Sequence, residues 1–157
     1  MTPPRVTIIP PHVLAAVYAH ARAAFPDECC GYLRGPAGGD AVDEAVACTN
    51  AQAAGDHPIA PERGADSGFV IAGAELFAFA RSFDSPRPAR IVYHSHPNGR
   101  AYFSAVDRAA AAGAGYPVQH LVVGVAQERG GTSVTEAVQV AWSEEAGDFV
   151  EIARWTV

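Results

Sequence analysis

Two histidines and an aspartate lie close together in the middle of this 157-residue sequence, in the stretch YHSHPNGRAYFSAVD that spans residues 93–107. His94 and His96 follow the apolar run RIVY and are separated by one residue, so in a β-strand both imidazoles project from the same face. Pro97 would end such a strand, and Asp107 follows within the first turn of an expected helix. Two imidazoles and one carboxylate can hold a zinc ion and leave one position open for water, which is the pattern of a catalytic zinc site.

Each half of this pattern also has a purely structural explanation. An HxH pair by itself is compatible with the polar end of a strand. Ser104 and Asp107 form an SxxD pattern at a helix start, which resembles a capping box. A helix cap does not explain why Ser104 and Asp107 follow so closely after two histidines on the same face of a strand. The combination therefore favours a metal site.

Hydrolysis at such a site also needs a carboxylate that does not bind the metal, because the attacking water must lose a proton and the leaving amine must gain one. Glu28 is the preferred candidate, since it lies in PDECCGYLRG between an expected helix end and an expected strand start. The other candidates are Glu44, Glu62, Glu75 and the acids near the C-terminus. His57 could approach the site from a loop at residues 51–67. His12 and His20 are expected at surface or boundary positions, and His120 is expected at a core or edge position.

The elements that position these residues follow from apolar periodicity and from the prolines and glycines between the periodic segments. Helices are expected at residues 12–25, 72–83 and 104–115. Strands are expected at residues 30–35, 41–50, 89–96, 118–126, 132–142 and 148–157. The first two strands form a hairpin around GPAGGD, and long turns such as QERGG separate the last strands. This order predicts one α/β (α+β) domain over residues 1–157, with a mixed sheet flanked by helices.

The bulk composition argues against several classes of protein. A formal charge of −6 with scattered basic residues argues against a nucleic-acid-binding protein. No apolar run approaches the roughly 18 residues that a membrane span needs. The first residues lack the layout of a signal peptide, so we expect a cytoplasmic protein. Cys29, Cys30 and Cys48 form neither a disulfide framework nor a CxxC zinc knuckle and are expected to be buried and reduced.

The segment HSHPNGRAYFSAVD resembles the H-S/T-H-P-x6-S-x-x-D signature of the JAMM (MPN-plus) metalloproteases. PDECCGYLRG is similar to the first motif of the prokaryotic, JAB-type members, and Thr49-Asn50 and FVIAGAEL extend the similarity. The resemblance covers most of the chain, from residue 10 to residue 145. It implies the family's fold, a curved mixed sheet with helices on its sides in a cytidine-deaminase-like, layered arrangement.

The same resemblance implies a mechanism and a class of partner. One Zn²⁺ would be held by His94, His96 and Asp107, with Glu28 as general base and Ser104 as donor to the oxyanion. Family substrates are bonds after the C-terminal glycines of ubiquitin or ubiquitin-like proteins. The chain is short and resembles bacterial members, which implies a ubiquitin-like sulfur-carrier protein with a Gly-Gly end as the partner.

Two other interpretations belong to different classes of function. The first is a metal-free MPN-type scaffold or interaction module, although such members usually lose metal ligands and this chain has them all. The second is a thiol enzyme that uses Cys30 and a histidine, which requires a thiolate activated by a neighbouring base. The sequence does not select the carrier, the oligomeric state or an activating partner.

Overall fold

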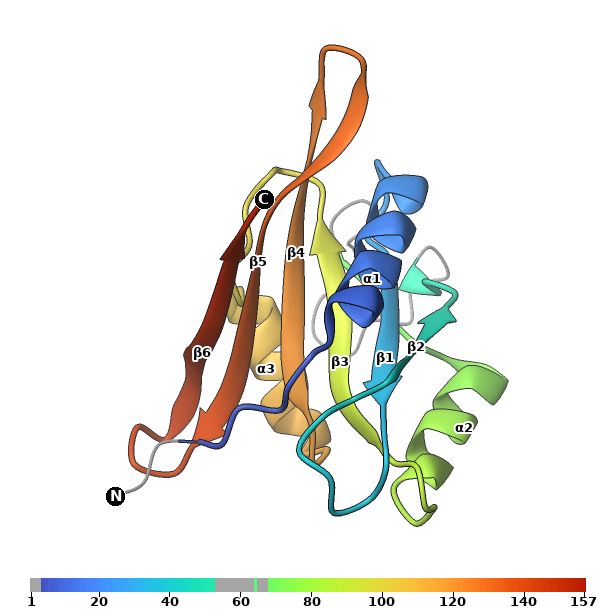
Figure 1. Cartoon of the computed structure of the whole chain (residues 1–157), viewed down its shortest axis with the longest axis vertical. Helices are drawn as coiled ribbons and strands as arrows, with labels where there is room; N and C mark the ends of the chain where they lie inside the picture. Colours follow the sequence, from blue (N-terminus) through green and yellow to red (C-terminus); the bar gives the residue numbers. More distant parts are fainter. Residues whose placement is uncertain (1–3, 53–63, 65–67) are drawn as a thin grey trace.

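A single mixed sheet runs through the middle of the molecule in this computed structural model (Figure 1). The structure describes residues 4–52, 64 and 68–157. Within these residues, six strands follow the order β2-β1-β3-β4-β5-β6. The strands are β1 (Cys30–Arg34), β2 (Glu44–Cys48), β3 (Ala89–His96), β4 (Gln119–Glu128), β5 (Gly131–Ser143) and β6 (Asp148–Thr156). The helices of the described residues are α1 (Pro11–Ala24), α2 (Gly73–Ser82) and α3 (Ala105–Ala114).

The pairing of the strands is mixed because α3 connects β3 to its neighbour β4 by a crossover. These two strands are parallel, whereas every other neighbouring pair in the sheet is antiparallel. The parallel pairing brings the carboxyl ends of β3 and β4 to the same edge of the sheet. The expected mixed α/β sheet with flanking helices is confirmed.

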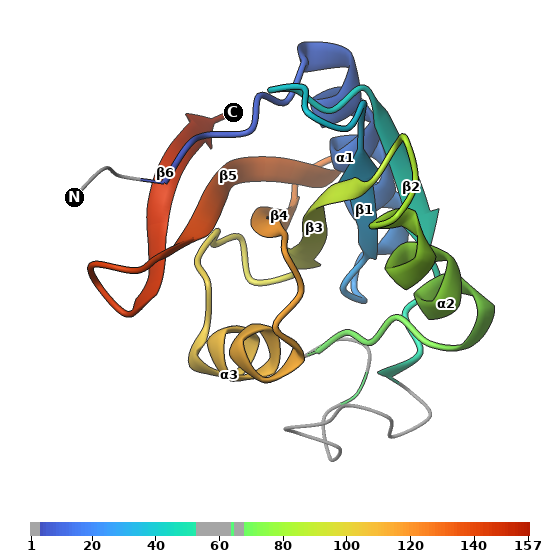
Figure 2. The same ribbon diagram turned by 90° about the horizontal axis from the view of Figure 1, so that it is seen from below.

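The helices cover the two faces of the sheet unequally. Helix α1 lies on one face, while α2 and α3 lie on the other (Figures 1 and 2). Helix α1 buries Val13, Leu14, Val17 and Ala21 against the sheet. Pro11 occupies the first turn of α1, where its missing N–H removes no intrahelical hydrogen bond.

Side chains alternate between these two faces along β3. Ile91 and Tyr93 belong to the core under α1, whereas Val92 packs with the residues beneath α2. His94 and His96 have the same parity as Val92, so their imidazoles project toward the face that α2 and α3 cover.

The loop between β3 and α3 lies directly on β4. The N–H of Gly99 donates to the carbonyl of Val125 at 2.9 Å, and Thr135 Oγ1 donates to the carbonyl of Gly99 at 2.7 Å. A Cβ at Gly124 would lie 2.9 Å from backbone atoms of Gly99 and Arg100, so only glycine permits this approach. The loop is therefore held against the sheet at Gly99 and Arg100.

The strands near the C-terminus differ from their predicted bounds. QERGG is not a long turn, because β4 and β5 continue through it and pair as far as Glu128 and Gly131. Only Arg129 and Gly130 remain between the strands, and Gly130 supplies the positive φ of 98° that so tight a turn requires. Strand β2 is shorter than the predicted segment at residues 41–50.

Most of the predicted loop at residues 51–67, including His57 and Glu62, falls outside the described residues. In the part of the chain that the structure describes, no helix has the length and apolar character needed to cross a membrane.

Candidate metal centre

The histidine pair lies at the carboxyl end of β3 and is almost completely enclosed. His94 is 0% exposed and His96 is 5% exposed. Their Nε2 atoms face each other at 3.1 Å. The Phe69 ring stacks on His94 with a centroid distance of 4.4 Å, and the Tyr102 ring packs on the edge of His96 at 4.7 Å. The two rings are thus oriented by aromatic packing and converge on one point.

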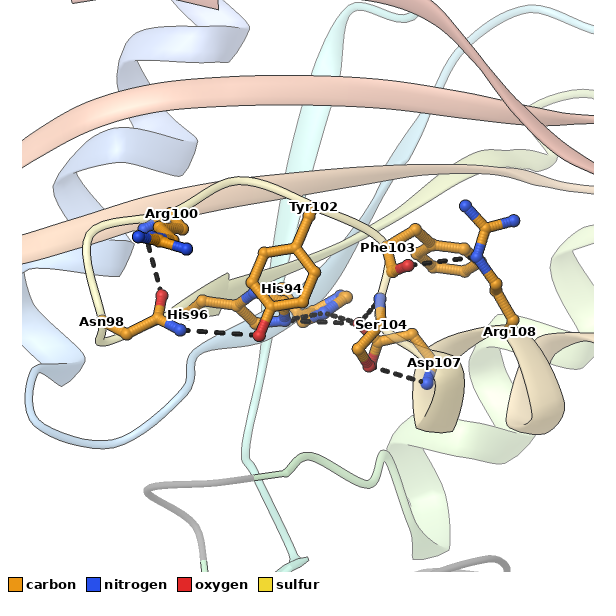
Figure 3. Close-up of polar contacts among 9 residues, drawn as sticks. All are labelled: His94, His96, Asn98, Arg100, Tyr102, Phe103, Ser104, Asp107 and Arg108. Atoms are coloured by element: carbon orange, nitrogen blue, oxygen red, sulfur yellow. Dashed lines mark hydrogen bonds and ion pairs between the residues drawn. The ribbon is translucent and has the colours of Figure 1, made fainter.

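Asp107 points its carboxylate at the same point from the first turn of α3 (Figure 3). Asp107 Oδ2 lies 3.1 Å from His94 Nε2 and 3.2 Å from His96 Nε2. Ser104 is the N-cap of the helix and forms a complete capping box with this aspartate. The Ser104 N–H donates to Oδ2 and the Asp107 N–H donates to Ser104 Oγ, both at 3.0 Å. Asp107 Oδ2 therefore takes part both in the helix cap and in the cluster with the two histidines. The helix-cap and metal-site interpretations of the sequence are thus compatible.

Glu28 reaches the histidines from the other side, immediately before β1. It is 6% exposed, and its carboxylate lies within 4.8 Å of the ring nitrogens of His94 and His96. Its neighbour Cys29 exchanges two hydrogen bonds with Ser95, which lies between the two histidines. The Cys29 N–H donates to Ser95 Oγ at 2.8 Å, and the Ser95 N–H donates to the Cys29 carbonyl at 3.2 Å. These bonds tie the segment carrying Glu28 to the strand carrying the histidines.

Asn50 is a second residue that holds this segment, and we did not assign it a role from sequence. Its Nδ2 donates to the carbonyls of Glu28 and Gly68, each at 2.9 Å. Its Oδ1 accepts the N–H groups of Gln52 at 2.9 Å and Val70 at 3.1 Å. Asn50 thus joins the end of β2, the backbone of Glu28 and the chain that leads into α2. The Thr49-Asn50 similarity was the only sequence signal for it.

The donor set fits a tetrahedral metal ion. The three atoms His94 Nε2, His96 Nε2 and Asp107 Oδ2 are 3.1–3.2 Å apart. Ligands at 2.0–2.1 Å from a tetrahedral zinc are separated by about 3.3–3.4 Å. Neither Nδ1 atom has a hydrogen-bond partner among the described residues, so the rings are not oriented by hydrogen bonds on that side. The Glu28 carboxylate also lies within 4.8 Å of both imidazole nitrogens, close enough to contact the ion or a water molecule bound to it.

The local electrostatics keep Asp107 ionised. Burial would raise the pKa of this carboxyl, but the two imidazoles beside it hold the pKa far below its usual range. Burial disfavours protonation of His94, yet Asp107 raises the pKa of His94 above its ordinary value. Burial lowers the pKa of His96. A carboxylate that stays anionic beside two imidazoles is suited to bind a cation.

The remaining candidates lie away from this point or have other partners. Glu44 is exposed and pairs with Arg34, and Glu75 accepts the Thr49 N–H at 2.8 Å. Burial raises the pKa of Cys29 to about 11 and that of Cys48 to about 12, and it raises the pKa of Cys30 still further. None of the three thiols is ionised near neutral pH, so the structure gives no support to a thiol nucleophile.

His120 lies in β4, close to the site, and its side chain is largely buried. Its ring contacts Phe103 and Phe149 at centroid distances of 4.9 and 5.4 Å. Burial lowers the pKa of His120 to about 3, so the imidazole is neutral. The sequence prediction of a core or edge position is consistent with this placement.

Comparisons with known proteins agree with this geometry. Among curated proteins, the CysO-cysteine peptidases of Mycobacterium tuberculosis and Mycobacterium bovis are each 32% identical over 102 residues, which is 65% of this chain. The matched region spans 63% of the length of these relatives, less than two thirds.

Solved structures show the same fold at lower sequence identity. A protein from Salinibacter ruber has a TM-score of 0.58 at 23% identity, with 92% of this chain and 88% of that chain covered. A JAB1/MPN domain protein from Archaeoglobus fulgidus has a TM-score of 0.51 at 17% identity, with coverages of 92% and 94%. The sequence profile described as "Prokaryotic homologs of the JAB domain" matches residues 10–142. This chain therefore belongs to the prokaryotic JAB family.

Proposed function

We propose that this protein is a zinc-dependent peptidase that hydrolyses the bond after the C-terminal Gly-Gly of a ubiquitin-like sulfur-carrier protein. The observation that carries the proposal is the convergence of His94, His96 and Asp107 within 3.2 Å of one another, with the Glu28 carboxylate beside them. The similarity to CysO-cysteine peptidases supports the substrate class.

The metal would be held by His94 Nε2, His96 Nε2 and Asp107 Oδ2. When bound, a zinc ion lowers the pKa of water toward neutrality and polarises a carbonyl group. Glu28 accepts the proton of the attacking water and then donates a proton to the departing amine. Its burial excludes bulk solvent from that proton transfer.

Ser104 contributes a hydrogen-bond donor in this mechanism. A serine hydroxyl has one proton and two lone pairs. The cap contact with the Asp107 N–H uses a lone pair of Oγ and not the proton. The O–H is therefore available to donate to the oxyanion of the tetrahedral intermediate, a contribution of roughly 3–4 kcal/mol in comparable sites.

A tail that ends in glycines suits the surroundings of the histidines. The rings of Phe69 and Tyr102 pack against His94 and His96, so little space remains for side chains next to the reacting carbonyl. An extended Gly-Gly segment presents only backbone there. We also place this activity in the cytoplasm, where the three free cysteines would stay reduced.

The proposal is tested with CysO of Mycobacterium tuberculosis given a C-terminus of Gly-Gly followed by a single residue. We expect about one zinc per chain, loss of cleavage with a chelator, and recovery with added zinc. Glu28→Gln should retain zinc and lower kcat by roughly 10²–10⁴-fold, whereas the matched control Glu44→Gln, at an exposed glutamate, should behave as wild type. Products are identified by mass spectrometry.

Two results would contradict the proposal. Full turnover by Glu28→Gln would remove Glu28 from its role as general base. A protein that binds no zinc and cleaves no extended carrier would instead be a non-catalytic scaffold of the same family.

A further inference from the structure

A cavity of about 320 Å³ adjoins the metal centre on the face that α2 and α3 cover. Figure 2 shows both helices on this face, and the cavity is lined by residues from each of them and from the sheet. Its walls are mostly apolar and include Phe69, Ile71, Leu76, Phe79, Val92 and Phe103. Asp107 forms part of the same wall, so the cavity borders the candidate site.

The sequence of α3 explains why this space is not filled by the protein's own side chains. Asp107, Ala110, Ala111 and Ala114 all line the cavity, and their spacing of three and four residues places them on one face of the helix. Three of these four positions carry only a methyl group. Larger apolar side chains there would have closed the cavity against Phe79 and Val92.

Three polar side chains lie in this otherwise apolar wall, namely Asp107, Tyr116 and His120. His120 lines the cavity and is 9% exposed. No hydrogen bond connects its imidazole to any other described residue. Its neighbours Phe103 and Phe149 are phenyl rings, which offer the imidazole no partner in a conventional hydrogen bond. The cavity therefore offers mostly apolar walls, with a neutral imidazole and the Tyr116 side chain in addition to the Asp107 carboxylate.

We infer that this cavity binds the side chain of the residue on the amine side of the scissile bond, which is the residue that the enzyme releases. The inference rests on the proposed function, because it assumes cleavage after Gly-Gly. Glycines on the carbonyl side have no side chains to place in a cavity. The side chain nearest to the scissile bond is therefore that of the leaving residue, and a cavity beside Asp107 is placed to receive it.

The lining determines the class of residue that fits. An uncharged side chain, aliphatic or sulfur-containing and up to the size of methionine, gains apolar contacts with the phenyl rings. A thioether or thiol can also approach the imidazole of His120. Lysine and aspartate would lose hydration without gaining an opposite charge, apart from the Asp107 carboxylate that the metal centre uses.

The first experiment compares carriers that differ only in the leaving residue. The probes are Mycobacterium tuberculosis CysO given a C-terminus of Gly-Gly followed by Met, Gly, Lys or Asp. Wild-type enzyme should cleave the Met extension with a kcat/KM about 10–200-fold above those for Lys and Asp. Ala110→Leu should lower the ratio of Met to Gly cleavage at least about ten-fold. The matched control Ala109→Leu, at an exposed position on the same helix, should keep the wild-type ratio.

The second experiment does not depend on catalysis. L-Methionine, the product of the Met probe, is titrated into the protein while the imidazole NMR signals of His120 are recorded, with L-aspartate as the control ligand. The signals should shift with L-methionine in the wild type and in Ala109→Leu, but not in Ala110→Leu.

The outcomes separate the two proposals. Equal cleavage of the Met and Asp extensions would overturn the cavity assignment and leave the peptidase proposal in place. Absence of all cleavage by the zinc-loaded protein would refute the peptidase proposal. In that case the titration decides, because unchanged His120 signals at saturating L-methionine would overturn the cavity assignment as well.

Discussion

Replacing Ser104 separates its structural role from its proposed chemical role. Ser104→Ala removes the side-chain half of the capping box, and loss of an N-cap costs about 1 kcal/mol. For a chain of 157 residues this lowers Tm by roughly 2–4 °C. The same change removes the hydroxyl donor, and loss of an oxyanion donor costs roughly 10²–10³-fold in kcat. Ser104→Thr keeps both the cap and the donor, so it should restore most of the stability and activity.

The assay combines thermal unfolding, zinc content and kcat on one extended carrier, at a temperature at which every variant is folded. The Asp107 oxygen that faces the histidines still accepts the backbone N–H of residue 104 in Ser104→Ala, so zinc content should stay near wild type. A variant with the expected Tm shift, normal zinc and undiminished kcat would show that Ser104 is only a helix cap. Loss of zinc together with kcat would instead indicate that the cap acts by orienting Asp107.

Three further predictions follow from buried polar groups. Asp107→Asn should reduce zinc, measured by elemental analysis, to well below one per chain, and wild-type affinity would contradict the ligand set. The pKa of His120 is lower in the folded protein than in the unfolded chain. As pH falls below about 6.5, His120 takes up a proton in the unfolded chain before it does so in the folded protein, so the free energy of unfolding decreases. Between pH 7 and pH 5 the wild type should lose about 2 kcal/mol more than His120→Phe in urea unfolding. The exposed-site control His12→Gln should show the wild-type loss, and equal losses in all three proteins would refute the argument. Asn50→Leu should cost roughly 2–6 kcal/mol for its four hydrogen bonds and lower kcat through Glu28, and a cost below about 0.5 kcal/mol would contradict its positioning role.

Local sequence signals predicted the elements that carry the metal centre. Pro97 and the apolar run before His94 predicted β3 with its observed bounds, because a strand and its terminator are both local features. Ser104 similarly marked the start of α3, where the structure has the N-cap. The sequence predicts a longer turn between β4 and β5 than the structure has. The positive φ of Gly130 allows a tighter hairpin than the polar residues of QERGG indicate.

Features that depend on contacts between distant segments could not be predicted in this way. Asn50 binds backbone groups of Glu28 and Gly68, and no spacing rule connects these positions. Predicting the cavity beside Asp107 likewise requires knowing that side chains of α2 and the sheet lie across from the alanine face of α3 without filling the space between them. A sequence pattern within one segment indicates which chemical groups that segment carries. Which residues those groups contact depends on how distant segments pack in the fold.

The close approach at Gly124 limits how the family's chains can vary around the site. Because the loop at residues 97–103 rests on β4 with no room for even a methyl group, lengthening it would lift Asp107 away from the histidines. The β4–β5 hairpin extends away from the body of the molecule and carries no residue of the centre (Figure 1). Insertions, tags or fused domains would therefore be tolerated at Arg129–Gly130, and the segment between the second histidine and the helix should keep a fixed length.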